Sequence, residues 1–224
     1  AHGKKSASDK RKAVAAAVAA AGALMASSAA QAGVETSAST ITIKSDNIGN
    51  VVGTNQGISN INIGTGANTY RNNGNNVVSH DSIAVGTNAT GTGDKAVAIG
   101  KGASATKENG VAVGFGATNE SIDSVAIGTR AKSSKDMDVA IGKEAQATGG
   151  ESLAFGSQSN ASGPATIAVG KESNASGSSA VAAGYQSAAA GDNAVAVGKN
   201  TTASATNAVA VGLRATATGT RAIA

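Results

Sequence analysis

Ten glycines recur at intervals of 14 residues in this chain, and each one ends a four-residue tetrad. The residue two before each glycine is alanine, and the residue three before it is valine, isoleucine or leucine. These repeat glycines are Gly86, Gly100, Gly114, Gly128, Gly142, Gly156, Gly170, Gly184, Gly198 and Gly212. So regular a period indicates a solenoid, in which each repeat forms one coil.

The tetrad alternates a bulky residue, alanine, a second bulky residue and glycine, except that Ala183 replaces the second bulky residue in one coil. Alternation with period two predicts a β-strand, because successive side chains leave opposite faces of the pleat. A second alternation of small residues starts three residues past each glycine, as at Ala103 and Ala105, and predicts a second short strand. Each coil therefore has two strands and two turns.

Seven residues past the repeat glycine, most coils carry another glycine. Glycine adopts positive φ without steric cost, so we expect these residues to supply the positive φ of the second turn. They are Gly93, Gly149, Gly163, Gly177, Gly191 and Gly219.

Two short strands cannot bury their own apolar face, so neighbouring coils must stack as parallel ladders about 4.8 Å apart, in a rod of about 50 Å. Two assignments of the tetrad faces are open. Either the alanine row fills the thin interior and the aliphatic stripe points outward, or the aliphatic side chains lie inside and alanine forms the contact surface. A long exposed aliphatic stripe is an aggregation hazard for a monomer, and both assignments imply an oligomer.

The composition excludes several functional classes. The 224 residues include no cysteine and only 2% aromatic residues, and His2 and His80 are the only histidines. Disulfides, thiol catalysis and a histidine-based metal site or triad therefore have no residues to draw on, and we expect no cofactor and no metal. The formal charge of +4 comes from the basic amino end, since 13 basic and 13 acidic residues follow from Gly33 onward. Nucleic acid is therefore not expected as a partner.

The amino end has the pattern of an export signal. A basic stretch ends at Lys12, an apolar run covers residues 13–26, and Ala30-Gln31-Ala32 is a small-x-small cleavage site. The alternative is an alanine-rich helix. We expect a vector-derived remnant and signal peptide in residues 1–32, an irregular cap with first coils and a loop insertion in residues 33–81, and the head repeats in residues 82–224.

The irregular region contains two segments that alternate like strands, residues 40–44 and residues 61–64. The second segment, Asn-Ile-Asn-Ile-Gly from Asn60 to Gly64, is similar to a degenerate tetrad. Gly64 and Gly86 are further apart than one repeat period, so a loop insertion near Tyr70 is predicted. Loops on rigid scaffolds often carry binding, which makes Tyr70 a candidate ligand contact. The alternative is that the insertion closes the end of the roll.

Outward-facing charges concentrate one or two residues after the repeat glycines, and stacking brings them into ladders. Their default role is solubility and protection of the sheet edge, with small contributions from opposite-sign pairs. The alternative is a ligand groove. The candidate ligand-contact residues on this basis are Lys101, Arg130, Lys143, Lys171, Lys199 and Arg214.

The extended tetrads read Asp-Ser-Ile-Ala-Val-Gly (81–86), Asp-Ser-Val-Ala-Ile-Gly (123–128), Glu-Ser-Leu-Ala-Phe-Gly (151–156) and Asn-Ala-Val-Ala-Val-Gly (193–198 and 207–212). These motifs resemble the 14-residue head repeats of the trimeric autotransporter adhesins, the family typified by the Yersinia adhesin. The resemblance covers residues 82–224. It implies an all-β fold, a homotrimer of left-handed parallel β-rolls, displayed on the bacterial surface and anchored in the outer membrane through a stalk and barrel that this chain lacks.

The same resemblance implies that the chain is not an enzyme and acts as an adhesin head. The expected partner is a host extracellular-matrix protein, such as collagen, fibronectin or laminin, or a receptor on other cells. No membrane contact is expected from this fragment itself, because the anchor is absent. The full family consensus, Asn-Ser-Val-Ala-Ile-Gly with serine three residues on, is matched only in part, since no coil keeps all of its polar residues.

Competing functions leave traces in the sequence. Residues 99–103 resemble the hexapeptide of β-helix acyltransferases, but those have 18-residue coils and usually a catalytic histidine. Calcium-binding rolls would need an aspartate in every turn. Ice or crystal-surface binding is the main alternative, because residues four and six past the glycine point outward and pair as Thr90 with Thr92 or Thr216 with Thr218. Charged and amide side chains such as Lys132 and Glu120 interrupt those rows.

Overall fold

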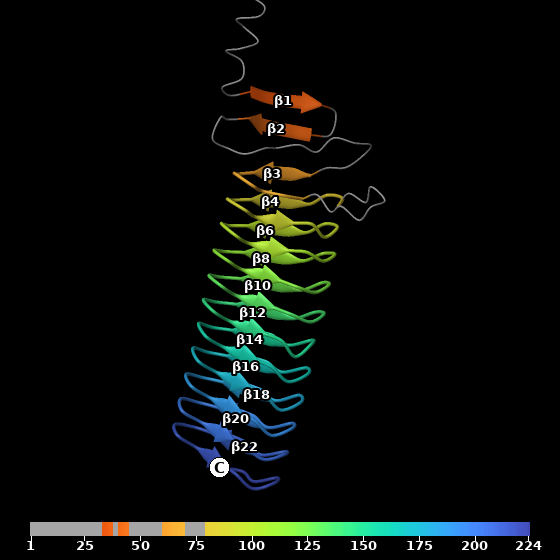
Figure 1. Ribbon diagram of the computed structural model, residues 1–224. Helices are drawn as coiled ribbons and strands as arrows, with labels where there is room; N and C mark the ends of the chain where they lie inside the picture. The colour runs from red at the N-terminus through yellow and green to blue at the C-terminus, as the bar shows by residue number, and fades with distance from the viewer. Residues whose placement is uncertain (1–32, 38–39, 45–59, 70–78) are drawn as a thin grey trace, which may run out of the picture.

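The computed structural model describes residues 33–37, 40–44, 60–69 and 79–224, and the last range winds into a rod of stacked coils (Figure 1). The predicted signal peptide and Tyr70 lie outside the described residues. Within them all regular structure is β, as the sequence predicts.

Three sheets make up the described part. Strands β1 (Gly33–Ser37) and β2 (Thr40–Lys44) pair antiparallel at the amino end. The tetrads form the first sheet of the rod, with strands β3 (Ile61–Ile63), β4 (Ile83–Val85), β6 (Val97–Ile99), β8 (Val111–Val113), β10 (Val125–Ile127), β12 (Val139–Ile141), β14 (Leu153–Phe155), β16 (Ile167–Val169), β18 (Val181–Ala183), β20 (Val195–Val197) and β22 (Val209–Val211). The small-residue segments form the second sheet, with strands β5 (Thr90–Gly91), β7 (Ser104–Ala105), β9 (Thr118–Asn119), β11 (Lys132–Ser133), β13 (Gln146–Ala147), β15 (Asn160–Ala161), β17 (Asn174–Ala175), β19 (Ala188–Ala189), β21 (Thr202–Ala203) and β23 (Thr216–Ala217).

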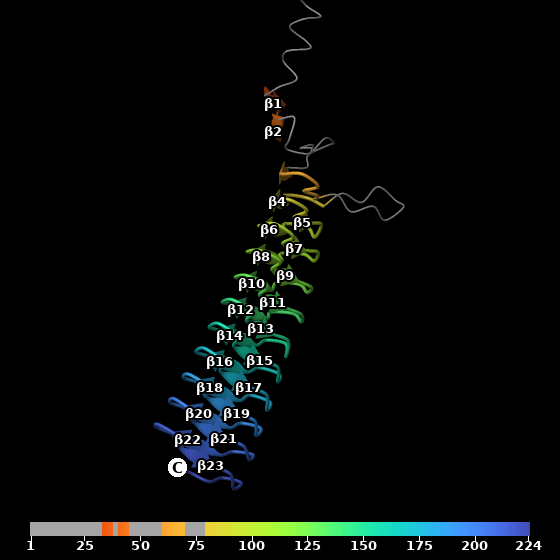
Figure 2. The same ribbon diagram turned by 60° about the vertical axis from the view of Figure 1, so that its left-hand side comes forward.

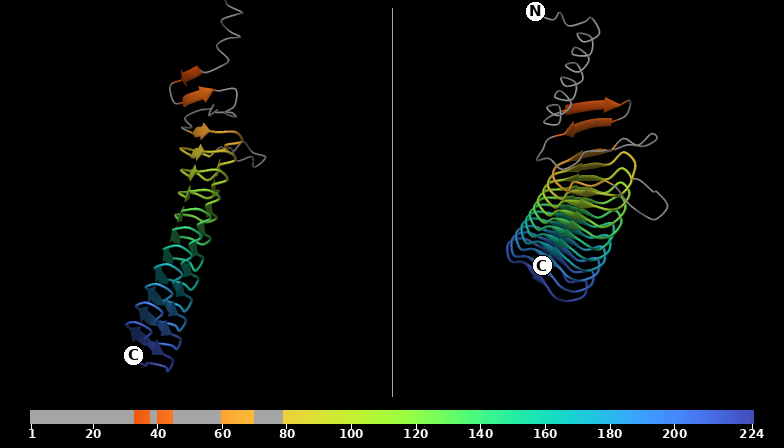
Figure 3. Two further views of the ribbon diagram at one scale, coloured as in Figure 1. Left: turned by 90° about the vertical axis from the view of Figure 1, so that its left-hand side faces the viewer. Right: turned by 45° about the horizontal axis from the view of Figure 1, so that its top comes forward.

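The two sheets of the rod run back to back along its length, joined by turns at both edges (Figures 2 and 3). All their strands pair parallel, and each residue faces its equivalent in the adjacent coil, as Ala126 faces Ala112 and Ala140. The coil is therefore set by the repeat itself. The degenerate tetrad continues the same ladder, because β3 pairs with β4 through Asn62 and Ala84.

The structure decides which face of the tetrad strand is inside. The central alanine of every tetrad, such as Ala98 or Ala154, is fully buried, whereas the flanking aliphatic residues are half-buried or exposed, with Ile99 39% and Phe155 50% accessible. The first of the two open assignments is therefore confirmed. The interior columns hold mainly alanine, with some buried serine and threonine, and such small side chains let the two sheets approach closely.

The repeat glycines stack directly on one another. Each has φ between 125° and 140°, a region that residues with a side chain rarely adopt. A Cβ atom on Gly142 would lie 2.4 Å from the carbonyl oxygen of Gly156, and the same clash recurs from Gly86 to Gly198. Glycine is required here for two reasons, conformation and close approach of the next coil.

Both turns place a positive-φ residue third in a four-residue turn, closed by hydrogen bonds such as Ala103 N–H to Gly100 C=O (3.1 Å) and Ala96 N–H to Gly93 C=O (3.2 Å). In the second turn this residue lies nine past the repeat glycine, as at Lys95 (φ 56°). The expectation that the glycines seven past supply the positive φ is therefore wrong. At Gly93 the reason for glycine is close approach, since a Cβ would lie 1.9 Å from the carbonyl oxygen of Lys107.

The left-handed residues direct their N–H groups along the rod. Glu144 N–H donates to Thr129 C=O (2.8 Å), and Glu151 N–H donates to Asp136 C=O (3.0 Å). A left-handed residue other than glycine costs about 1–2 kcal/mol, and these inter-coil bonds offset that cost. The ladder of hydrogen bonds thus continues through the turns.

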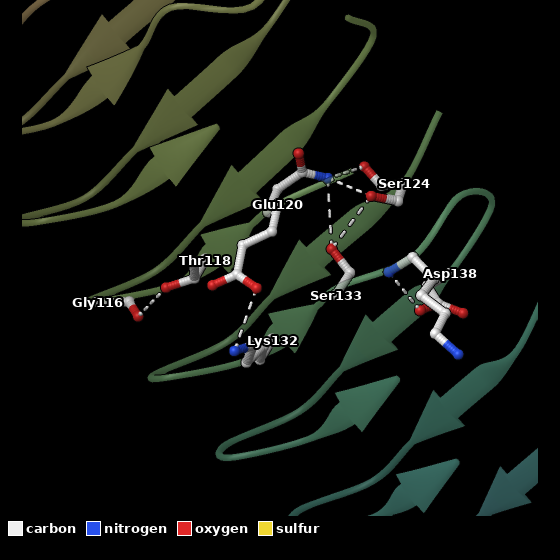
Figure 4. Close-up of polar contacts among 9 residues, drawn as sticks. Gly116, Thr118, Glu120, Ser124, Lys132, Ser133 and Asp138 are labelled. Atoms are coloured by element: carbon white, nitrogen blue, oxygen red, sulfur yellow. Dashed lines mark hydrogen bonds and ion pairs between the residues drawn. The ribbon is translucent and has the colours of Figure 1, made fainter. Parts of the chain in front are cut away.

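A polar layer divides the alanine interior into two apolar clusters, one at residues 96–117 and one at residues 140–217. Within this layer Asn119, Ser124, Ser133 and Asp138 are all fully buried. Ser124 and Ser133 point toward each other inside the roll, and the Asn119 amide donates to both hydroxyl groups, whereas Lys132 and Glu120 pair on the outer face (Figure 4).

The buried carboxylate of Asp138 is fully engaged. Its Oδ1 accepts from the N–H groups of Gly150 (2.9 Å) and Ser152 (3.1 Å) and from Ser152 Oγ (2.6 Å), and its Oδ2 accepts from Lys135 N–H (2.9 Å). These hydrogen bonds connect two coils. They also give the buried carboxylate the partners that a buried polar group needs.

We expect Gly142→Ala to lower the free energy of unfolding by about 2–4 kcal/mol, from backbone strain plus the clash with the next coil. Thermal unfolding followed by circular dichroism measures the change. Gly102→Ala is the matched control, because Gly102 has φ 67° and an added Cβ meets no atom within 4 Å. Equal losses for the two variants would contradict the stacking argument.

We expect Asp138→Ala to cost about 2–4 kcal/mol of stability, because it leaves buried N–H donors of the next coil without an acceptor. Asp138→Asn retains an acceptor oxygen and should lose less. Chemical denaturation of the two variants gives the comparison, and a neutral Asp138→Ala would show that the polar layer does not stabilise the roll.

Candidate functional site

The first turn of every coil carries the outward-facing charges that the sequence singles out. We call the residues one and two past each repeat glycine, from Thr87 to Arg214, the first-turn edge. Its six cations stand against the carboxylates of Glu144 and Glu172, a net charge of +4. The six are Lys101, Arg130, Lys143, Lys171, Lys199 and Arg214, and all six are exposed.

Aromatic side chains lie between these cations. The ammonium groups of Lys171 and Lys199 both lie 5.6 Å from the ring centre of Tyr185, one from the coil before it and one from the coil after. The Arg130 guanidinium lies 6.0 Å from the ring centre of Phe115. Each contact contributes about 0.5–1 kcal/mol at an exposed site, and together they hold long side chains in place along the edge.

A second column of side chains binds neighbouring coils together. Gln186 Nε2 donates to Glu172 Oε2 (2.6 Å), and Asn200 Nδ2 donates to Gln186 Oε1 (2.9 Å). The hydrogen bonds from Gln186 and then Lys171 lower the pKa of the Glu172 carboxyl, while the hydrogen bond with Glu172 raises the pKa of Lys171. Both groups therefore stay charged at neutral pH.

The structure brings some of the predicted residues together and leaves others separate. Tyr185 connects Lys171 with Lys199, and the Glu144 carboxylate connects Arg130 (3.6 Å) with Lys143 (3.9 Å). Lys101 and Arg214 lie on the same edge and make no ion pair within the described ranges.

Sequence reasoning missed the aromatic part of this edge. Phe115 and Tyr185 occupy the column one residue past the repeat glycine, the same column as Lys101 and Lys171. Their shared register was the signal that could have found them, because residues one repeat period apart are direct neighbours in the rod.

The opposite edge of the roll has the opposite charge. We call the residues seven to nine past each repeat glycine, from Gly93 to Arg221, the second-turn edge. It carries six carboxylates and four cations, and five of the carboxylates lie in residues 93–151. The six are Asp94, Glu108, Asp123, Asp136, Glu151 and Asp192.

A groove of about 570 Å³ opens on this second-turn edge. Its lining includes Lys135, Asp136, Met137, Glu151 and Pro164. Hydrogen bonds from Ser121 Oγ and Ile122 N–H lower the pKa of the Asp136 carboxyl, so the groove keeps a negative charge.

Neither edge has the composition of a metal site. Among residues 33–37, 40–44, 60–69 and 79–224, no three histidine, cysteine, aspartate or glutamate residues cluster as metal ligands. In the same ranges no helix is long and apolar enough to span a bilayer.

Comparison with known proteins addresses the family. A family model described as the YadA head domain repeat, in two copies, matches residues 92–117, 120–145, 147–173, 175–201 and 203–224, together more than half of the chain. None of the curated proteins compared with the chain matches it. Among solved structures, the collagen-binding domain of the Yersinia adhesin YadA is similar at 29% identity and a TM-score of 0.41, over 61% of this chain and 68% of that one.

The family match and the observed coils agree on the unit of structure. The family model describes two copies of the repeat, and each of the first four matched segments extends over nearly two coils of the rod. The matched segments also follow one another along the rod with short gaps. The chain therefore belongs to the YadA head repeat family.

Proposed function

We propose that this chain is the head of a surface-displayed trimeric adhesin that attaches bacteria to host extracellular matrix or to other cells. Membership of the YadA head repeat family carries this proposal, since that family is one of adhesin heads and not a class of enzymes. The protein is exported and displayed on the bacterial cell surface, as a homotrimer whose partner is a matrix protein, such as collagen, fibronectin or laminin, or a cell-surface receptor.

The surface chemistry supports attachment by repetition. Cations recur in six of the ten coils along the first-turn edge, so a bound fibre or cell meets several similar weak contacts instead of one pocket. Three copies in one head multiply those contacts, and linked weak sites gain avidity through their high effective concentration. Such binding needs no deep cleft and no reactive group.

The carboxy-terminal half of the first-turn edge is the part best suited to contact a ligand. There Tyr185 is 38% exposed between Lys171 and Lys199, an aromatic ring flanked by two cations. Tyrosine dominates many protein interfaces, because its ring supplies large contact area at low cost in side-chain entropy. We propose Arg214 as a further contact in the same half of this edge, with Tyr70 as a candidate outside the described residues.

Ice or crystal-surface binding has less support from the structure. The outward column of the second sheet starts with Thr90, Ser104 and Thr118, but Lys132 then pairs across it with Glu120 at 3.2 Å, and Asn160 bonds to Asn174. A regular hydroxyl lattice is thereby interrupted in the middle of the rod. A thermal-hysteresis assay separates this alternative from adhesion.

We expect the purified chain to bind immobilised collagen, fibronectin or laminin, or to aggregate bacteria that display it. Tyr185→Ala should weaken the measured binding by about tenfold or more, because a buried interface tyrosine carries a large share of binding energy. Ser157→Ala, in the same column of the edge, is the matched control and should bind like the natural chain. Biolayer interferometry on the coated surfaces measures both.

Binding to none of these surfaces, with an intact circular dichroism spectrum, would refute the adhesive role and leave the fold unaffected. Binding that is unchanged by Tyr185→Ala would move the contact away from this part of the edge.

A further inference from the structure

The two turn edges of the roll are complementary over the same coils. In residues 87–144 the first-turn edge carries Lys101, Arg130 and Lys143 against Glu144, a net charge of +2. In residues 93–151 the second-turn edge carries five carboxylates against three lysines, a net charge of −2. One chain therefore presents opposite charges on opposite sides of the same stretch of rod.

Exposed apolar side chains also occur on both edges in these same coils. Phe115 on the first-turn edge is 49% exposed, and Ile122 (42%) and Met137 (52%) are exposed on the second-turn edge of the same and the following coil. The groove beside Met137 lies at this height. Isolated exposed apolar residues are ordinary, but here they coincide with the groove and with the charge complementarity.

The complementarity is confined to this half of the rod. In residues 157–221 the first-turn edge keeps a net charge of +2 from Lys171, Lys199 and Arg214 against Glu172, whereas on the second-turn edge Asp192 and Arg221 cancel. The groove also ends at Ala165. The first half of the rod is therefore the part that can pair edge to edge.

Symmetry determines which edges meet. In a ring of three identical chains every contact is heterologous, so one surface of each chain meets a different surface of the next. When the outer face of the tetrad sheet is turned toward a common axis, its two flanking turn edges become the surfaces that meet. A first-turn edge then faces a second-turn edge at the same height, where opposite charges attract and like edges never meet.

We propose that the first-turn edge between Lys101 and Glu144 docks into the groove and the acidic turns of the second-turn edge, between Asp94 and Glu151, of a second copy of this chain. This inference rests on the proposed function, because it assumes copies that associate around the tetrad sheet. The docking places the charge attraction between copies in the first half of the rod.

The test reverses the charge of each edge by substitution and measures the mass of the assembled protein. Lys101→Glu with Lys143→Glu reverses the first-turn edge, and Glu108→Lys with Glu151→Lys reverses the second-turn edge. Either pair should raise the concentration at which the trimer dissociates by about tenfold or more, because like charges then face each other. All four substitutions together should restore assembly. Size-exclusion chromatography with light scattering over a dilution series, at low and high NaCl, gives the masses.

The matched control uses the other half of the same edge. Lys171→Glu with Lys199→Glu changes the charge equally but lies opposite a second-turn edge without net charge, so the trimer should persist as in the natural chain. Circular dichroism of every variant at the lowest concentration shows whether the individual roll still folds.

Two results would overturn the docking. One is a trimer that tolerates reversal of a single edge, or a fourfold variant that does not recover. The other is reduced retention of the Lys101→Glu, Lys143→Glu variant on immobilised heparin with an unchanged trimer mass, which would assign this half of the edge to a sulfated polysaccharide. A natural chain that stays monomeric at all concentrations would refute the proposed homotrimer as well, so the two failures are distinguishable.

Discussion

The backbone of each repeat glycine packs against the backbone of the repeat glycine in the next coil, and the rest of the roll is built around that contact. At Gly128 a Cβ atom would lie 2.3 Å from the Gly142 carbonyl oxygen, and φ there is 133°. Only glycine meets both conditions, so the chain repeats it at the same place in each coil. The contact keeps the coils in register, and register aligns every other column of side chains along the rod.

Register explains why the interior can be so thin and still hold the coils together. The central alanines of the tetrads stack in one fully buried column, and the parallel ladders pair the backbone through strands and turns alike. Such an interior has no room for a substrate or cofactor, so recognition must use the outer columns. The polar layer at Asn119 and Asp138 is the exception to the alanine interior, and the Asn119 amide nitrogen and the Asp138 carboxylate form hydrogen bonds with the adjacent coil.

The outward-facing columns give the two edges of the roll different chemical compositions. Carboxylates and the groove beside Met137 dominate one edge in the first half of the rod, and cations with aromatic rings dominate the other. On the proposals made above, the first half of the rod joins copies of the chain and the second half meets the ligand. Charged side chains in columns that the repeat aligns then serve assembly in one half of the rod and adhesion in the other.

The sequence by itself determined the period, the strand positions, the parallel stacking and the column that holds the cations, because these follow from alternation and from the constant spacing of the repeat glycines. It left open which tetrad face lies inside, since alanine and valine alternate equally well in either orientation. It also misplaced the left-handed residues of the second turn, because lysine, methionine and glutamate adopt positive φ there only where the N–H bonds to the preceding coil. The groove at Met137 was decided by the tertiary structure alone, because it depends on how residues from several coils converge on one side of the rod.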